Sequence, residues 1–248
     1  MNLRLLAVCA LALLGSGATL AQAQVTPLMN YVGMPFSGVR TFQGGRNFVD
    51  GNRVDRGTSE RLYRDGQGRT RIERDVPAQV RANNPNMEAT QITINDPVSG
   101  DRIQLHAATK SAIVWHNVVT PAGAVPTAAP AVTVTFARRF RPATDPAWSA
   151  PVALGEKTFD GLRATGQRRQ YTIPVGELSN EKPIVLTVEQ WYSPELSLIV
   201  AQSGTSTLGG DFSNQVENVV RGEPSPALFA IPADYSRTDV QHRDAAAQ

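Results

Sequence analysis

The side chains that could perform acid–base or metal chemistry are few in this chain and widely spaced. The sequence has three histidines, His106, His116 and His242. We expect His106 and His116 on neighbouring strands, where two imidazoles could share a metal ion. A catalytic zinc site takes three protein ligands, however, and the sequence marks no third. We therefore predict neither a metal site nor a cofactor.

Two other arrangements would suit hydrolysis. Glu189 and Glu195 flank Trp191, and a carboxylate pair beside an aromatic platform is typical of a glycosidase. Glu195 belongs to a turn signal, though, where acidic residues are common. A serine hydrolase needs its nucleophile on a constrained turn, but no Gly-x-Ser-x-Gly occurs and Ser203 lies in a polar stretch. We predict no catalytic residue, and a hydrolase is the least favoured alternative.

The N-terminus carries the pattern of an export signal. Arg4 precedes an apolar run of about ten residues, and Ala21 and Ala23 are small residues at the positions that a signal peptidase reads. The run is shorter than the about 20 residues that cross a bilayer. Cys9 lies inside the run, unlike the cysteine of a lipoprotein signal. We expect a leader over 1–23, cleaved after Ala23, and a periplasmic or secreted product.

Composition narrows the class of the remaining chain. The leader carries Arg4, so 24 basic residues become 23 against 22 acidic ones. A net charge this small predicts no strong field for nucleic acid or an anionic membrane. Cys9 is the single cysteine, so its removal excludes disulfides, thiolate metal sites and cysteine nucleophiles. Lysine is scarce, while arginines alternate with acids over 53–75, which favours solvated strand faces with cross-strand ion pairs over an anion site.

Strand and turn signals dominate, and no long segment has a helical period. Asp-Gly pairs predict tight turns at Asp50-Gly51, Asp65-Gly66 and Asp160-Gly161. In the second hairpin, Leu62 and Ile72 should share a buried face while the arginines meet solvent. Further strands are expected at 36–42, 91–95, 102–106, 112–116, 183–192, 196–202 and 212–221. The segment 226–235 should close the core with Leu228, Phe229 and Ile231.

Short turns join these strands in sequence order, which predicts an antiparallel meander. We expect a mainly β chain with little helix, folded as a curved sheet or half-barrel, with a two-sheet sandwich as an alternative. The expected domain covers 24–235, with an Ala/Pro-rich insertion near 118–131, and 236–248 should be a disordered tail.

Three motifs, in this order and spacing, resemble a group of uncharacterised secreted bacterial proteins. They are the hairpin of 63–73 followed by 92–97, the stretch Glu189–Leu196 and the stretch Pro226–Tyr235. More distantly, the chain resembles periplasmic proteins of the LolA/RseB type. That resemblance implies an antiparallel half-barrel whose apolar concave side holds acyl chains or a protein partner. The chain shows no evident N-terminal amphipathic helix or plugging helices, so the resemblance carries over no functional residue.

Aromatic side chains are the remaining candidates for a binding surface. On an open curved sheet some of them would line an apolar face that a ligand covers. We predict a non-enzymatic envelope protein that binds lipid, an acylated protein or a partner protein on a concave sheet, with an interaction protein that lacks a small-molecule site as the alternative. The candidate ligand-face residues are Trp115, Trp191, Tyr192, Phe229 and Tyr235.

Overall fold

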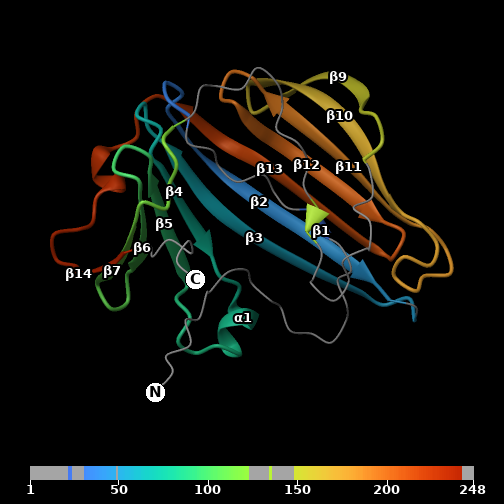
Figure 1. Cartoon of the computed structure of the whole chain (residues 1–248), viewed down its shortest axis with the longest axis horizontal. Helices are drawn as coiled ribbons and strands as arrows, with labels where there is room; N and C mark the ends of the chain where they lie inside the picture. Colours follow the sequence, from blue (N-terminus) through green and yellow to red (C-terminus); the bar gives the residue numbers. More distant parts are fainter. Residues whose placement is uncertain (1–21, 24–30, 49, 123–133, 136–147, 242–248) are drawn as a thin grey trace, which may run out of the picture.

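A computed structural model describes residues 22–23, 31–48, 50–122, 134–135 and 148–241. Its main feature is one open sheet of twelve strands in the order β14-β7-β6-β5-β4-β3-β2-β13-β12-β11-β10-β9. Figure 1 shows the sheet curving between its two edges, β14 and β9. The expected mainly β chain, folded as a curved sheet or half-barrel, is confirmed.

The described elements include two short helices besides the strands. The helices are α1 (Ala78–Ala82) and the 3-10 helix η2 (Pro226–Phe229). The sheet contains β2 (Phe36–Asn47), β3 (Arg53–Arg64), β4 (Thr70–Asp75), β5 (Thr90–Asp96), β6 (Asp101–His106), β7 (Ser111–His116), β9 (Val152–Phe159), β10 (Leu162–Ile173), β11 (Ile184–Ser193), β12 (Leu198–Ser206), β13 (Gly210–Arg221) and β14 (Ser236–Gln241). A separate pair joins β1 (Gln22–Ala23) to β8 (Val134–Thr135).

The turn chemistry places most hairpins where the sequence predicts them. Asp160 and Gly161 both have positive φ, 46° and 74°, between β9 and β10. Gly51 has a φ of 84° in the turn between β2 and β3. β2 is longer than the strand expected at 36–42, because it pairs without interruption from Phe36 to Asn47 along β3.

The connectivity departs from a pure meander in two places. β2 pairs with β13, which joins the two halves of the chain, and β14 pairs in parallel with β7. The predicted disordered tail is therefore wrong for 236–241, since ladder hydrogen bonds can fix a polar edge strand without an apolar face. Most of the predicted leader and insertion lies outside the described residues.

The two faces of the sheet differ in what covers them. Residues paired across strands point to the same side, so the pairing assigns every side chain to a face. One face carries Trp191, Ser203, Gln215 and Thr41, and is named the groove face below. Over β4 to β7, the segment 226–235 packs on this face against Ile94, Leu105 and Ala112.

The opposite face holds buried charges as well as apolar side chains. Arg40 and Glu60 are both 2% exposed and form an ion pair of 3.1 Å, and Glu60 also binds Arg74 at 3.0 Å. Tyr171, Ile173, Ile184, Leu186 and Val188 form an apolar cluster on this face.

The expectation that the hairpin arginines meet solvent is wrong for Arg64, which is fully buried. Its guanidinium lies over the rings of Tyr31 and Phe36 and donates to the carbonyl oxygens of Met34 and Leu196. Burial lowers the pKa of Arg64 to about 10, against the opposing effect of the nearby tyrosines. Leu62 and Ile72 do pair, with Leu62 fully buried and Ile72 packed against the core.

Candidate functional site

A groove crosses the groove face over β2, β13, β12 and β11, with β9 at one end. It has a volume of about 400 Å³ and continues into a second hollow of about 450 Å³. Glu189, Ser203 and Ser213 line both hollows, which makes them one continuous depression. The side chains that reach the first hollow from the groove face are Thr41, Gln43, Lys157, Phe159, Glu189, Trp191, Ala201, Ser203, Ser213, Gln215 and Glu217.

One end of the groove is aromatic. The rings of Trp191 and Phe159 lie 5.5 Å apart between centroids at an angle of 56°. The ammonium of Lys157 lies 4.9 Å from the Phe159 centroid and 6.0 Å from that of Trp191. Ala201 pairs with Trp191 across β11 and β12. This end offers a small apolar contact surface with one cation beside it.

The floor of the groove is built from short polar side chains. Alternation along each strand brings one hydroxyl or amide after another to the same face, including those of Thr41, Ser203 and Gln215. Gln215 Nε2 donates to Glu217 Oε1 at 3.3 Å. A floor of this kind can hydrogen-bond a ligand along its length.

The charges at the far end of the groove neutralise one another. Arg53 reaches across β2 and donates to both carboxylate oxygens of Asp211, at 2.7 and 2.9 Å. It passes directly over Gly45, where a Cβ would lie 2.1 Å from the guanidinium. These hydrogen bonds lower the pKa of Asp211. Glu189 is likewise paired, accepting from Arg168 at 2.8 Å.

Lys157 and Glu217 are the groove's charges that lack an opposite charge. Within the described part of the chain, neither has an oppositely charged side chain at ion-pair distance. Both can therefore interact with a ligand without first breaking an ion pair.

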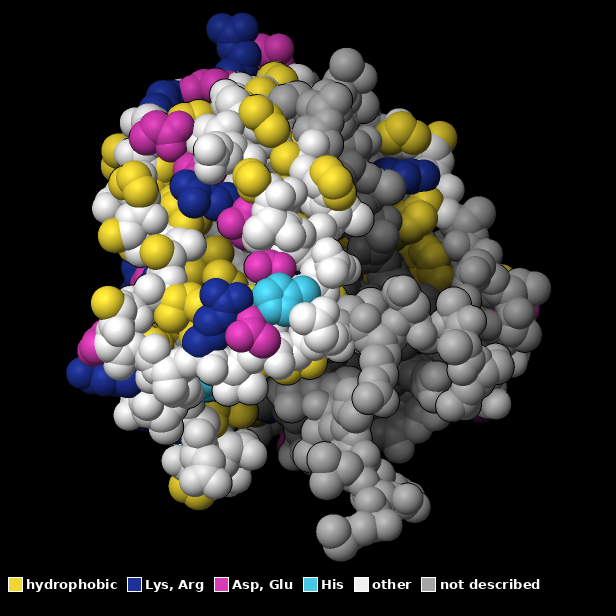
Figure 2. Space-filling view, turned by 60° about the vertical axis from the view of Figure 1, so that its left-hand side comes forward, with side chains coloured by type: hydrophobic (Ala, Val, Ile, Leu, Met, Phe, Trp, Pro, Cys, Tyr) yellow, Lys and Arg dark blue, Asp and Glu magenta, His cyan; other side chains and the backbone are white. Residues whose placement is uncertain are grey.

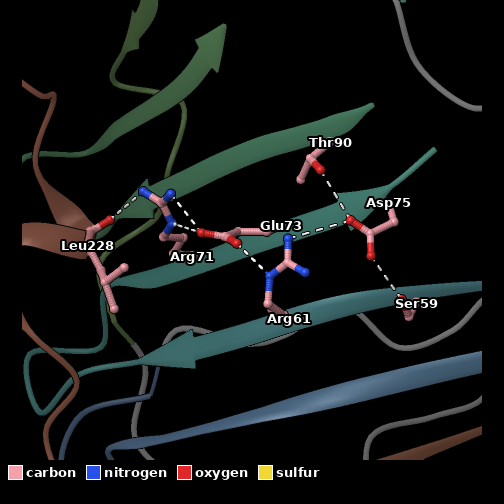
Figure 3. A network of polar contacts seen from close by, with 7 residues as sticks. All are labelled: Ser59, Arg61, Arg71, Glu73, Asp75, Thr90 and Leu228. Atoms are coloured by element: carbon pink, nitrogen blue, oxygen red, sulfur yellow. Dashed lines mark hydrogen bonds and ion pairs between the residues drawn. The ribbon is translucent and has the colours of Figure 1, made fainter. Parts of the chain in front are cut away.

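A network of arginines and acids lies beside the groove on the same face (Figure 3). Glu73 accepts from Arg61 at 2.7 Å and from Arg71 at 2.8 Å, and Arg71 also donates to the Leu228 carbonyl at 2.8 Å. Burial opposes ionisation of Glu73, but these hydrogen bonds lower its pKa. Asp75 accepts from Ser59 and Thr90. The cross-strand ion pairs predicted for 53–75 are confirmed.

The five aromatic residues proposed from the sequence do not share one surface. Trp191 alone lines the groove. Phe229 and Tyr235 pack on the apolar cluster over β4 to β7, Trp115 lies on the opposite face of β7, and Tyr192 is 4% exposed with its hydroxyl donating to Ser197 at 3.2 Å.

The candidate catalytic and metal-binding residues do not come together. His106 and His116 project from opposite faces of the sheet, each beside carboxylates, and His242 lies outside the described residues. Glu195 lies in the turn after β11 and binds Arg221, away from Glu189 in the groove. Among the described residues, no group of three or more His, Cys, Asp or Glu side chains could hold a metal ion.

Sequence reasoning missed Lys157, Phe159 and Gly166. Phe159 precedes the predicted Asp160-Gly161 turn, but its contact with Trp191 depends on β9 and β11 both flanking β10. Gly166 pairs with Trp191, and this register depends on the length of the connection between β10 and β11. The one signal that could have identified Lys157 is its residue type, because lysine is scarce in this arginine-rich chain.

No family model matches the chain, and no curated protein does. Similar solved structures include a LolA superfamily protein from Nitrosomonas europaea (9% identity, 82% of this chain and 92% of that chain, TM-score 0.34). Others are LprF from Mycobacterium bovis (11%, 82% and 91%, TM-score 0.32) and a putative outer membrane lipoprotein-sorting protein domain from Vibrio parahaemolyticus (9%, 77% and 88%, TM-score 0.27).

The resemblance to LolA-type proteins that the sequence suggested is thus found among structures as well. No helix of the described residues is long and apolar enough to cross a membrane.

Proposed function

We propose that this chain is an exported, non-enzymatic protein of the cell envelope that binds a partner protein in the groove. The observation that carries the proposal is the lining of the groove, where hydroxyl, amide and carboxylate side chains surround one small aromatic contact. An extended polypeptide has hydrogen-bonding groups along its whole length and an occasional apolar side chain. Its backbone matches the floor, and one apolar side chain matches Trp191 and Phe159.

A lipid or acylated ligand is the second candidate, supported by the contact between Trp191, Phe159 and Ala201. Together with Phe212 at the second hollow, these residues form the apolar part of the described groove lining, while a long acyl chain needs an apolar contact along most of its length. The groove therefore suits an acyl group less well than a polypeptide segment.

Export rests on the sequence, from the charged start, the apolar run and the small residues before Gln24. A non-enzymatic role is supported by the placement of the described histidines, which lie on opposite faces of the sheet and away from the acids that line the groove.

A photo-crosslinking amino acid placed at Ser203 tests the proposal in cells. We expect a discrete crosslinked protein from this position, and none from the same amino acid at Val98, an exposed residue in the turn after β5. The purified protein should give no signal with a fluorescent fatty-acid probe. If the unaltered protein binds the probe, the Trp191→Ala variant does not, and Ser203 gives no crosslink, the ligand of the groove is an acyl group and not a partner protein.

A further inference from the structure

Three turns lie together at one end of the sheet. They join β2 to β3, β10 to β11 and β12 to β13, and the antiparallel order brings them to the same side (lower right in Figure 1). Asn47 N donates to Gly209 O at 3.0 Å, which links the first turn to the third. Thr207 N donates to Val185 O at 3.0 Å, which links the third to the start of β11.

Exposed apolar side chains are concentrated on these turns. Phe48 is 43% exposed, Val54 41%, Leu208 42% and Val175 57%. Within the described part of the chain, they are half of the large hydrophobic residues that are exposed. The four are named the turn tip here. At the opposite end of the sheet, Val98 and Val220 are exposed among polar neighbours.

The backbone of the turn tip is already hydrogen-bonded within each turn. Phe48 N donates to Asn52 O at 2.8 Å and Gly51 N to Phe48 O at 3.0 Å. Leu208 N donates to Ser206 Oγ at 3.2 Å, and Gly176 N to Asn180 O at 2.9 Å. A loop can enter an apolar medium only when its polar backbone groups are satisfied, and these N–H groups meet that condition.

The size and shape of the turn tip decide which partner it fits. The turn tip offers four partly exposed apolar side chains, against the about 20–30 residues that each partner of a standard protein complex contributes. The three turns project from the end of the sheet and have a convex surface. Charged side chains of both signs, including Arg46 and Asp50, surround them. A lipid bilayer accepts small projecting apolar groups without matching their shape, and polar headgroups accept both signs of charge.

We infer that the turn tip is a docking surface for the surface of a lipid bilayer, into which Phe48, Leu208 and Val175 insert. The tip lies at the strand ends, beyond the end of the groove where Arg53 binds Asp211. This function is separate from ligand binding in the groove and does not depend on it.

Vesicle flotation of the protein purified from the periplasmic fraction tests the inference, with vesicles of phosphatidylethanolamine and phosphatidylglycerol. The unaltered protein should float with the vesicles, and the double variant Phe48→Ser, Leu208→Ser should lower the bound fraction about tenfold. The matched control is Val98→Ser, Val220→Ser, which removes two exposed apolar residues from the other end and should bind as the unaltered protein does. Thermal unfolding of each variant establishes that it is folded.

A second measurement uses Phe48→Trp with brominated lipids, whose bromine atoms should quench the fluorescence added at position 48. Failure of the unaltered protein to float, equal binding by the turn-tip variant, or equal loss in the control variant would each overturn the inference. Binding that vanishes on vesicles of phosphatidylcholine alone would also overturn it, because it would show recognition of charge instead of apolar insertion.

Discussion

The indole of Trp191 lies directly on the backbone of Gly166, its cross-strand partner in β10. A Cβ atom at position 166 would lie 2.6 Å from Trp191 Cζ3. The aromatic end of the groove therefore depends on a residue that has no side chain. The same device recurs at Gly45, beneath Arg53, so glycines at both ends of the groove let a large side chain lie flat across a neighbouring strand.

Gly166→Ala should displace Trp191 from the groove. Overpacking of this kind costs about 1–3 kcal/mol, and the displaced indole should fluoresce at a longer wavelength because it meets more water. The matched control is Gly57→Ala in β3, where a Cβ meets its nearest atom at 3.4 Å. It should change the free energy of unfolding by less than about 0.5 kcal/mol. Equal effects of the two substitutions on fluorescence would show that Trp191 does not rest on Gly166.

Glu60→Gln should destabilise the protein by about 3–5 kcal/mol, because it leaves the buried Arg40 guanidinium without a counter-charge. Burial lowers the pKa of Arg40, and the nearby Glu60 carboxylate counteracts that effect. Urea unfolding measures the change. Glu156→Gln is the control, since its ion pair with Arg163 spans 4.0 Å between mostly exposed side chains. A change below 1 kcal/mol for Glu60→Gln would contradict the role assigned to the buried pair.

The attachment of β14 should weaken as pH rises. His116 lies at 2.9 Å from Asp101 and 2.7 Å from Asp239 of β14, and Arg237 also binds Asp239. Figure 2 shows charged side chains of both signs around a histidine on this side of the molecule. The hydrogen bonds to Asp101 and then Asp239 raise the pKa of His116 above its ordinary 6.5.

Because the pKa of His116 is raised in the folded state, the direction in which pH changes the attachment of β14 is determined. The stabilisation is complete below the unfolded pKa near 6.5 and is lost as pH rises through the folded-state value. Proteolysis within β14 should therefore speed up over that range in the unaltered protein, after correction for the protease's own pH profile. His116→Gln should remove the dependence, while His106→Gln should keep it. The same profile in the His116 variant would refute this assignment.

Export should remove the only thiol. The mass of the protein recovered from the periplasm should correspond to a chain that starts at Gln24, and a maleimide should not label it because Cys9 leaves with the leader. A labelled exported protein would show that the leader is retained.

Local turn chemistry could be predicted from the sequence, and long-range pairing could not. Asp160-Gly161 fixes its hairpin through two positive φ angles, which few other residue pairs adopt at low cost. β14 escaped prediction because its polar residues have no alternation, and its place depends on backbone hydrogen bonds to β7. The burial of Arg40 and Glu60 could not be predicted, because a buried arginine–glutamate pair and a solvated one have the same residue types in the sequence.

The groove could be predicted only in part for the same reason. Trp191 was identified as a ligand-face candidate from its residue type, but its neighbours Lys157 and Phe159 come from a strand two places away in the sheet. Tyr192, one residue along, points to the other face and is buried. Alternation along a strand predicts that Trp191 and Tyr192 point to opposite faces of the sheet. Only the order of the strands decides which of these faces carries the groove.

Protection of Trp191 in living cells tests the central claim most directly. Hydroxyl-radical oxidation can be measured by mass spectrometry at each tryptophan, in intact cells and in the purified protein. If a partner occupies the groove, Trp191 should be oxidised several-fold less in cells, while Trp115 and Trp148, which lie outside the groove, should react alike in both samples. An unchanged ratio at Trp191 relative to these two residues would contradict ligand binding in the groove.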